Sequence, residues 1–134
     1  MPVYNEEATV ATAIQTVLEV ELPVRSRELI VVDDGSSDAT PEALTAGTWK
    51  GVRVISHPSN LGKGAAVRTG LSQARGRYSG IVDADLELDP RDLARLVQVL
   101  VDEQPDAVFG ARRFPRRSAR TLRYWIGNRG VTIA

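Results

Sequence analysis

Residues 28–41 read ELIVVDDGSSDATP, and this stretch decides the class of fold. It opens with a short apolar run rich in β-branched residues, which is typical of a buried strand. Asp33, Asp34 and Gly35 follow with two serines, and residues of these types form turns. Pro41 then suits the first turn of a helix. A buried strand, a polar turn and a helix in direct succession indicate one unit of an α/β domain with a mainly parallel sheet.

The same succession recurs along the whole chain. Strands are predicted at 1–3, 28–32, 52–56, 78–82 and 106–111, and helices at 6–20, from about 41, at about 62–75, at 91–103 and from about 118. Asn5 is expected to cap the first helix and Asp89 the fourth, since both residue types favour that position. We therefore predict one three-layer α/β/α domain over residues 1–134, Rossmann-like, with a mainly parallel sheet.

Composition limits the class of protein. The chain has 134 residues, of which 43% are hydrophobic and 25% charged, which suits one globular domain with a core. It has no cysteine and a single histidine, His57, so thiolate chemistry and multi-histidine metal sites are excluded. We interpret His57 as a loop residue. No apolar run approaches the roughly 20 residues that a membrane-spanning helix needs.

The net charge of zero conceals a division along the sequence. Residues 1–106 hold all 17 acidic residues and have a net charge of −7, whereas residues 107–134 hold seven arginines and no acid. Most of these arginines lie in RRFPRRSARTLR, residues 112–123. Such a run is either a solvated helix start or a surface for phosphates or an anionic membrane. Both interpretations are retained.

Polar residues gather after each predicted strand. The segments concerned are residues 4–6, 33–38, 58–64, 83–87 and 110–113. In an open parallel sheet the carboxyl ends of the strands lie along one edge, and ligands bind beyond that edge. We therefore expect one cleft that holds a polar, charged ligand.

The fourth of these segments, DADLELD at 83–89, has an acid at every second position. Alternation at a strand end would place Asp83, Asp85 and Glu87 on one side, where their mutual repulsion favours a bound cation. Mg²⁺ and Mn²⁺ prefer carboxylate oxygen and keep water or substrate phosphates as further ligands. The alternative is a solvated turn that leads into the Asp89 cap.

Each of the other candidates also has a structural alternative. Lys63 follows Gly62 at a predicted helix start and could receive phosphate, although the segment is not a Walker A loop. Asp33 and Asp34 could accept hydrogen bonds from a base or a ribose, or serve the turn alone. The remaining candidates are Tyr4, which could pack over the cleft, Glu6, a first-turn acid, and Arg112, which could bind phosphate or belong to the solvated run.

Five motifs stand in order along the chain: PVYNEE, VVDDGSSDAT, NLGKGAAVRTG, VDADLELDP and FGARRF. Together they resemble the family 2 glycosyltransferases of GT-A fold, in particular the dolichyl- and polyprenyl-phosphate sugar transferases. The resemblance covers residues 2–128. It implies an inverting transfer from a nucleotide-diphosphate sugar, of the GDP-mannose or UDP-glucose type, to a polyprenyl phosphate or another acceptor.

The resemblance also implies roles for single residues. Pro2, Tyr4 and Glu6 match the segment that holds the nucleoside, and Asp34 matches the acid that reads the base. Asp83, Ala84 and Asp85 match the DxD element that binds Mg²⁺ or Mn²⁺, and Glu87 stands where related enzymes often have a metal-binding glutamine. Arg112 matches an arginine of the G-S-R-F motif, with Arg113 as its rival. Asp85 and Arg112 are thus the candidates for catalysis.

The chain is shorter than the family's usual catalytic domain, so we expect a nucleotide-binding half that is cut at both ends. An acceptor half, and the base that a hydroxyl acceptor would require, would lie downstream. The alternative is a non-catalytic nucleotide-binding module; a DxD phosphatase is disfavoured. We expect a cytoplasmic location, peripheral at the membrane face, a lipid-phosphate acceptor and no nucleic-acid partner.

Overall fold

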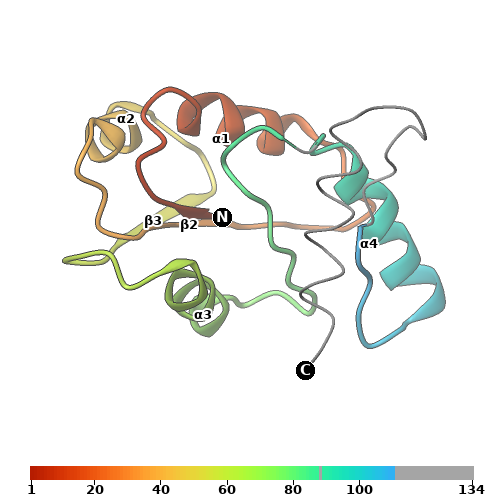
Figure 1. The fold of residues 1–134 in the computed structure, drawn as a ribbon. Coiled ribbons are helices and arrows are strands. Elements are labelled where there is room, and N and C mark those ends of the chain that lie inside the picture. Colours follow the sequence, from red (N-terminus) through yellow and green to blue (C-terminus); the bar gives the residue numbers. More distant parts are fainter. Residues whose placement is uncertain (88, 111–134) are drawn as a thin grey trace, which may run out of the picture.

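The computed structural model describes residues 1–87 and 89–110. They contain a three-stranded parallel sheet in the order β1-β2-β3 and four helices. The strands are β1 (Pro2–Val3), β2 (Leu29–Asp33) and β3 (Val52–Ser56), and the helices are α1 (Val10–Glu19), α2 (Thr40–Ala46), α3 (Lys63–Gln73) and α4 (Asp92–Glu103). Helices α1 and α2 cover one face of the sheet and α3 the other (Figure 1). The predicted three-layer α/β/α arrangement is confirmed.

The central strand β2 organises both halves of the core. Its side chains alternate between the two faces, and Ile30, Val31 and Val32 are all buried. Val31 joins the cluster under α1 and α2, which includes Val3, Val10, Ala13, Ile14 and Leu44. Ile30 and Val32 pack with Ala66 of α3 on the other face. A strand that is covered on both faces is a nearly continuous apolar run, as residues 29–32 are, which is why the strand could be recognised in the sequence.

The register aligns the carboxyl ends of the three strands. Val3 is paired with Asp33, and Asp33 with Ser56. The three segments that follow therefore leave the sheet at one edge, as expected for a parallel sheet. This edge is called the carboxyl edge below.

Two predicted strands are wrong. Neither residues 78–82 nor the described part of 106–111 is in a strand. Val82 packs against the core and Ala84 is buried, but Ile81 is 54% exposed. A strand requires a partner along its length, and β1 consists of only two residues. Burial of side chains near position 84 thus occurs without a ladder of backbone hydrogen bonds.

Two of the predicted helix ends also differ. Helix α1 begins at Val10 rather than after Asn5, which adopts a positive φ of 54° and uses its side chain elsewhere. Helix α4 begins at Asp92, but the Asp89 carboxylate does accept the backbone N–H of Arg91 at 3.0 Å. The helix predicted from about 118 lies outside the described residues. None of the helices in residues 1–87 and 89–110 is long and apolar enough to cross a membrane.

Candidate functional site at the carboxyl edge

The segments after β1 and β2 are joined by hydrogen bonds. The N–H of Asn5 donates to Ser36 Oγ at 2.9 Å, and Asn5 Oδ1 accepts the N–H of Ser37 at 2.8 Å. The N–H of Glu6 donates to Thr40 Oγ1 at 2.8 Å. This explains why Asn5 does not cap α1. Tyr4 and Glu6, both predicted to hold a nucleoside, therefore lie in a segment that hydrogen bonds to the next one hold in place. The Tyr4 side chain is exposed.

Glu6 and Pro2 are held in place by local contacts. Glu6 Oε2 accepts the hydroxyl of Thr9 at 2.5 Å, and its carbonyl accepts the N–H groups of Thr9 and Val10. The segment 6–10 is thus a turn that leads into α1. Pro2 lies within β1, paired with Val32. Their predicted roles as donor contacts stay predictions.

Asp34 is the most connected side chain of this edge. The residue is only 2% exposed. Its Oδ1 lies 2.6 Å from His57 Nδ1 and accepts the N–H of Leu61 at 3.1 Å, and its Oδ2 accepts the N–H of Gly62 at 2.7 Å. Burial by itself would raise the pKa of the Asp34 carboxyl, but these hydrogen bonds together hold that pKa below its usual value. Both oxygens are directed at the segment 57–62.

Asp33 is buried as well, and its Oδ1 accepts the N–H of Ser36 at 3.1 Å. Both acids of the pair therefore have structural partners, so the turn interpretation accounts for each of them. Asp34 as the acid that reads the base stays a prediction. Its hydrogen bonds show that it also fastens the next segment of the same edge.

Lys63 and Asp83 come together from different segments. Lys63 is the first residue of α3, and its Nζ lies 2.7 Å from Asp83 Oδ1. Both side chains remain open to solvent, with exposed fractions of 65% and 31%. An ion pair this exposed contributes little to stability. The pair matters for its position, because it shows that the predicted phosphate contact and the first acid of the predicted DxD element are neighbours.

The acids at 83–87 do not converge as alternation would place them. Residues 84–86 bend, Leu86 has a positive φ of 57°, and Ala84 is buried in the core. Asp85 Oδ1 accepts the N–H of Glu87 at 3.0 Å, as in a turn. Across residues 1–87 and 89–110, no three histidine or acidic side chains are grouped to hold a metal ion.

A divalent ion does not require three such groups. Mg²⁺ is commonly bound by one or two carboxylates, with waters and substrate phosphates as the other ligands. Asp83 and Asp85 flank the buried Ala84 and offer two carboxylates, of which Asp85 is exposed. Their oxygen chemistry fits Mg²⁺ or Mn²⁺. The metal site is thus compatible with the residues, and it stays a prediction.

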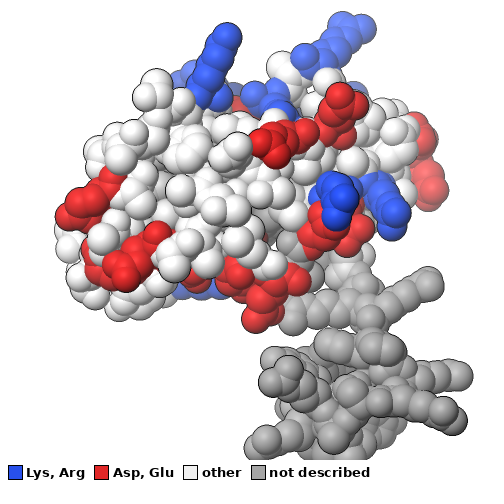
Figure 2. All heavy atoms as spheres, turned by 90° about the horizontal axis from the view of Figure 1, so that it is seen from above, with Lys and Arg blue, Asp and Glu red and all other residues white. Residues whose placement is uncertain are grey.

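The predicted arginine contacts lie beyond the described residues. Arg112, Arg113 and the arginine run belong to 111–134 and have no structural account. On the face shown in Figure 2, acidic and basic side chains are interspersed among uncharged areas. The acidic excess of residues 1–106 therefore does not form one continuous field on that face.

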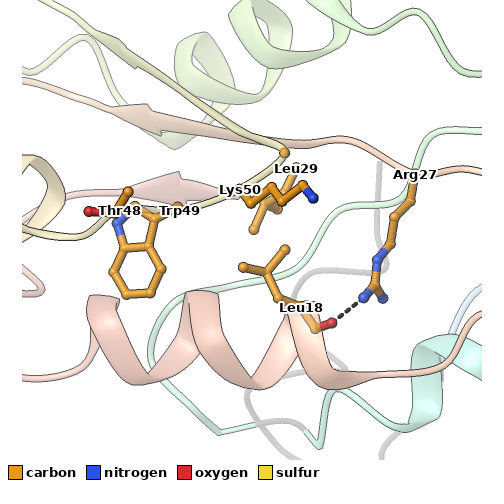
Figure 3. A pocket seen from close by; sticks show the side chains of 7 residues that line it. Leu18, Arg27, Leu29, Thr48, Trp49 and Lys50 are labelled. Carbon is orange, nitrogen blue, oxygen red and sulfur yellow. Dashed lines mark hydrogen bonds between the residues drawn. The ribbon is translucent and has the colours of Figure 1, made fainter.

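A pocket of about 260 Å³ lies away from this edge (Figure 3). It is lined by Leu18, Leu29, Trp49 and the charged residues Arg27 and Lys50, beside the amino ends of β2 and β3. The Arg27 guanidinium donates to the carbonyls of Leu18 and Val20, so it caps the carboxyl end of α1. The pocket is a feature of that helix end and adds no group to the candidate site.

Sequence reasoning missed His57 and Thr69 as parts of this edge. His57 Nε2 lies 2.9 Å from Thr69 Oγ1 of α3, while Nδ1 faces Asp34. The only signal was that His57 directly follows a predicted strand. Its partners are 23 and 12 residues away in the sequence, so no local pattern could reveal them.

Comparison with known families decides the membership of the chain. The profile of the family described as "Glycosyl transferase family 2" matches residues 1–128. The chain belongs to glycosyl transferase family 2. The match covers every segment of the carboxyl edge, and it confirms the resemblance of the five motifs.

Several curated proteins resemble this family 2 chain. The dodecaprenyl-phosphate galacturonate synthase of Rhizobium johnstonii is 34% identical over 119 residues, which is 84% of this chain and 35% of that protein. The undecaprenyl-phosphate 4-deoxy-4-formamido-L-arabinose transferase of Yersinia pestis is 36% identical over 103 residues, 74% of this chain and 32% of that protein. A dolichyl-phosphate beta-glucosyltransferase of Trichomonas vaginalis is 39% identical over 93 residues, 63% of this chain and 28% of that protein.

A solved structure supports the fold. The crystal structure of S. aureus TarS matches 86% of this chain and 22% of that chain, with a TM-score of 0.67 and 24% sequence identity. This likeness confirms the α/β fold of the family 2 chain. The chain spans about a third, or less, of the length of the curated relatives described above.

Proposed function

We propose that this chain is the donor-binding part of a glycosyltransferase that moves a sugar from a nucleotide-diphosphate sugar to a polyprenyl phosphate. The observation that carries the proposal is the ion pair of Lys63 with Asp83 at 2.7 Å. The pair joins an ammonium group, which can receive phosphate, to Asp83, the first acid of the predicted DxD element. A diphosphate site at this edge would agree with ligand binding beyond the carboxyl ends of parallel strands. Membership of glycosyl transferase family 2 and the names of the relatives support the same activity.

The roles of the residues follow the two parts of the donor, its nucleoside and its diphosphate, and the metal ion. Pro2, Tyr4, Glu6, Asp33 and Asp34 would hold the nucleoside. The diphosphate would be bound by Gly62, Lys63 and Ala84 of the two adjoining segments, and by Arg112. Asp83 and Asp85, together with Glu87, would hold Mg²⁺ or Mn²⁺. When bound, such an ion stabilises negative charge on the diphosphate.

The chemistry requires stabilisation of the leaving group. Breaking the bond between sugar and phosphate leaves negative charge on the nucleotide. The Lys63 ammonium lies at the candidate diphosphate position, and with Arg112 it would stabilise that charge as it develops. An acceptor phosphate is already ionised and needs no strong base. A single displacement at the anomeric carbon inverts its configuration, and the donor is of the GDP-mannose or UDP-glucose type.

The names of the relatives refer to polyprenyl and dolichyl phosphates, which are lipids, and this supports a location at a membrane. The seven arginines of residues 107–134 suit a surface that carries phosphate groups. We therefore place the protein at the cytoplasmic face of the membrane, as a peripheral protein. The nucleotide sugar and the lipid phosphate are its partners, and no nucleic acid is involved.

A titration tests the donor site. GDP, UDP and their sugar conjugates are titrated calorimetrically into the wild type with and without Mn²⁺, and the same is done with Asp85→Ala. The exposed Asp106→Ala variant is the matched control, because it removes one carboxylate that belongs to none of the predicted donor or metal contacts. Binding that requires Mn²⁺, is lost in Asp85→Ala and persists in Asp106→Ala is expected. Absence of binding in the wild type under every condition would overturn the proposal.

A second candidate is a module that binds the donor without transferring the sugar. The alignment of the predicted donor contacts at the ends of β1, β2 and β3 supports donor binding by itself. Incubation with the bound nucleotide sugar and a polyprenyl phosphate separates the two. Formation of a glycosylated lipid phosphate indicates a transferase, whereas binding without product indicates a donor-binding module.

A further inference from the structure

We propose that His57 is a positioning residue that holds the segment Leu61–Lys63 in the geometry that receives a diphosphate. The inference rests on the proposed function, because it assigns that segment to the donor. It goes further in naming a largely but not fully buried side chain that needs no contact with the donor.

The first observation is that His57 bridges two elements. Its Nδ1 lies 2.6 Å from Asp34 Oδ1 at the end of β2, and its Nε2 lies 2.9 Å from Thr69 Oγ1 of α3. The side chains of His57 and Asp34 are 10% and 3% exposed. The His57 N–H also donates to the carbonyl of Asp33 at 2.8 Å. Both ring nitrogens of His57 and its backbone N–H thus have hydrogen-bond partners.

The second observation is that the Asp34 carboxylate accepts two further hydrogen bonds besides its contact with His57. It accepts the N–H groups of Leu61 and Gly62, the two residues that precede Lys63. Gly62 has a positive φ of 90°, a conformation in which glycine is at little disadvantage. The segment before α3 is therefore attached to β2 through one carboxylate, and His57 holds that carboxylate in place.

Histidine is suited to this position because its two nitrogens face opposite ways. An ionised carboxylate can only accept hydrogen bonds, so Nδ1 carries a proton towards Asp34. Nε2 can then accept the hydroxyl proton of Thr69. Asparagine could replace the bond to Asp34 but would not reach Thr69. This difference makes the two contacts separable by mutation.

The consequence for a ligand is preorganisation. Lys63 begins α3, and its ammonium group lies beside Asp83. If the segment before α3 is not ordered in the free protein, a ligand must order it on binding. The free energy of this ordering makes the free energy of binding less favourable. Removing His57 should therefore weaken the binding of a diphosphate that His57 does not touch.

The test uses the full chain, Mn²⁺, and whichever of GDP and UDP the wild type binds. His57→Ala is expected to weaken binding by about tenfold, or about 1.4 kcal/mol, with a smaller loss of about threefold in Thr69→Val. His57→Asn should bind within about threefold of the wild type, because it keeps one donor towards Asp34. Ser72→Ala is the matched control on the same helix, since its hydroxyl donates to the Thr69 carbonyl within that helix.

Amide hydrogen exchange supplies a readout that does not require ligand. The N–H groups of Leu61 and Gly62 should exchange at least about tenfold faster in His57→Ala than in the wild type. His57→Asn should restore most of that protection. If His57→Ala does not fold, the comparison of His57→Asn and Thr69→Val with Ser72→Ala carries the test alone.

The outcomes distinguish the inference from the proposed function. A wild type that binds neither nucleotide overturns the proposed function and the inference with it. A wild type that binds, with unchanged affinity in His57→Ala and Thr69→Val, overturns the inference alone. Faster exchange at Leu61 and Gly62 with unchanged affinity also overturns it, because His57 would then only support the fold.

Discussion

The substitution Asp34→Asn tests the hydrogen bonds by which the carboxylate directly after β2 holds the segment before α3. Asparagine has nearly the same shape as aspartate, but one of its two acceptor oxygens becomes an NH₂ donor. In the structure Oδ1 faces His57 and Leu61 and Oδ2 faces Gly62, so in either orientation a donor meets a donor. The variant loses at least one hydrogen bond to a charged acceptor and leaves an N–H unsatisfied.

The magnitude follows from these contacts. A hydrogen bond to a charged group contributes about 1.5–3 kcal/mol, and an unsatisfied buried donor costs about 1–3 kcal/mol. The N–H groups at 61 and 62 lie in a partly exposed loop and can recover some hydration from water. We therefore expect the free energy of unfolding to fall by about 3 kcal/mol in Asp34→Asn, measured by urea denaturation at pH 7. Asp106→Asn, an exposed control, should change it by less than about 0.5 kcal/mol.

The same variant has a pH signature. The hydrogen bonds at Asp34 hold its folded pKa below the unfolded value, so between these two values the unfolded state binds more protons. The stabilisation is thus present above the unfolded pKa and is lost as the pH falls through the folded pKa. The difference in stability between the wild type and Asp34→Asn should shrink in that acidic window. A variant as stable as the wild type at pH 7, or a difference independent of pH, would refute the reasoning.

Three further predictions concern the core, the ion pair and the metal. Ile14→Ala, at a fully buried side chain between α1 and the sheet, should lower the free energy of unfolding by about 2–5 kcal/mol, measured by urea denaturation; a loss below about 1 kcal/mol would contradict the described packing. Lys63→Ala should change stability by less than about 1 kcal/mol, since its pair with Asp83 is solvent-exposed, yet weaken nucleotide-diphosphate binding about tenfold; a large stability loss, or unchanged affinity in calorimetry, would count against its assignment. Removal of divalent ions with EDTA should abolish nucleotide binding and Mn²⁺ should restore it; binding that survives EDTA would exclude a metal bridge at Asp83 and Asp85.

Much of the fold could be predicted because its signals are local. The strand at 28–32 was recognisable since β2 is covered on both faces and its residues 29–32 are all apolar. Pro41 was placed correctly in the first turn of α2 because its fixed φ suits that position. The five motifs, each a short run of residues, were sufficient to predict the family.

The errors occurred where formation of an element depends on a distant partner. Residues 78–82 have the composition of a buried strand, but strand formation needs a neighbouring backbone, and β1 has only two residues. Asn5 is a favourable cap by type, yet its side chain accepts a hydrogen bond from Ser37, 32 residues away. The alternating acids at 83–87 bend at Leu86, so the expected common side is not formed.

The sequence by itself determined the class of fold, the polar carboxyl edge and the membership of glycosyl transferase family 2, because turn chemistry, burial patterns and motifs are properties of neighbouring residues. Only the tertiary structure decided what these side chains do to one another. It shows that Asp34 is buried and accepts hydrogen bonds from Leu61 and Gly62. It also shows that His57 contacts Asp34 and Thr69, and that Lys63 lies beside Asp83. Such contacts join residues far apart in the chain, and their energies depend on burial and geometry that exist only once the sheet and its helices have packed.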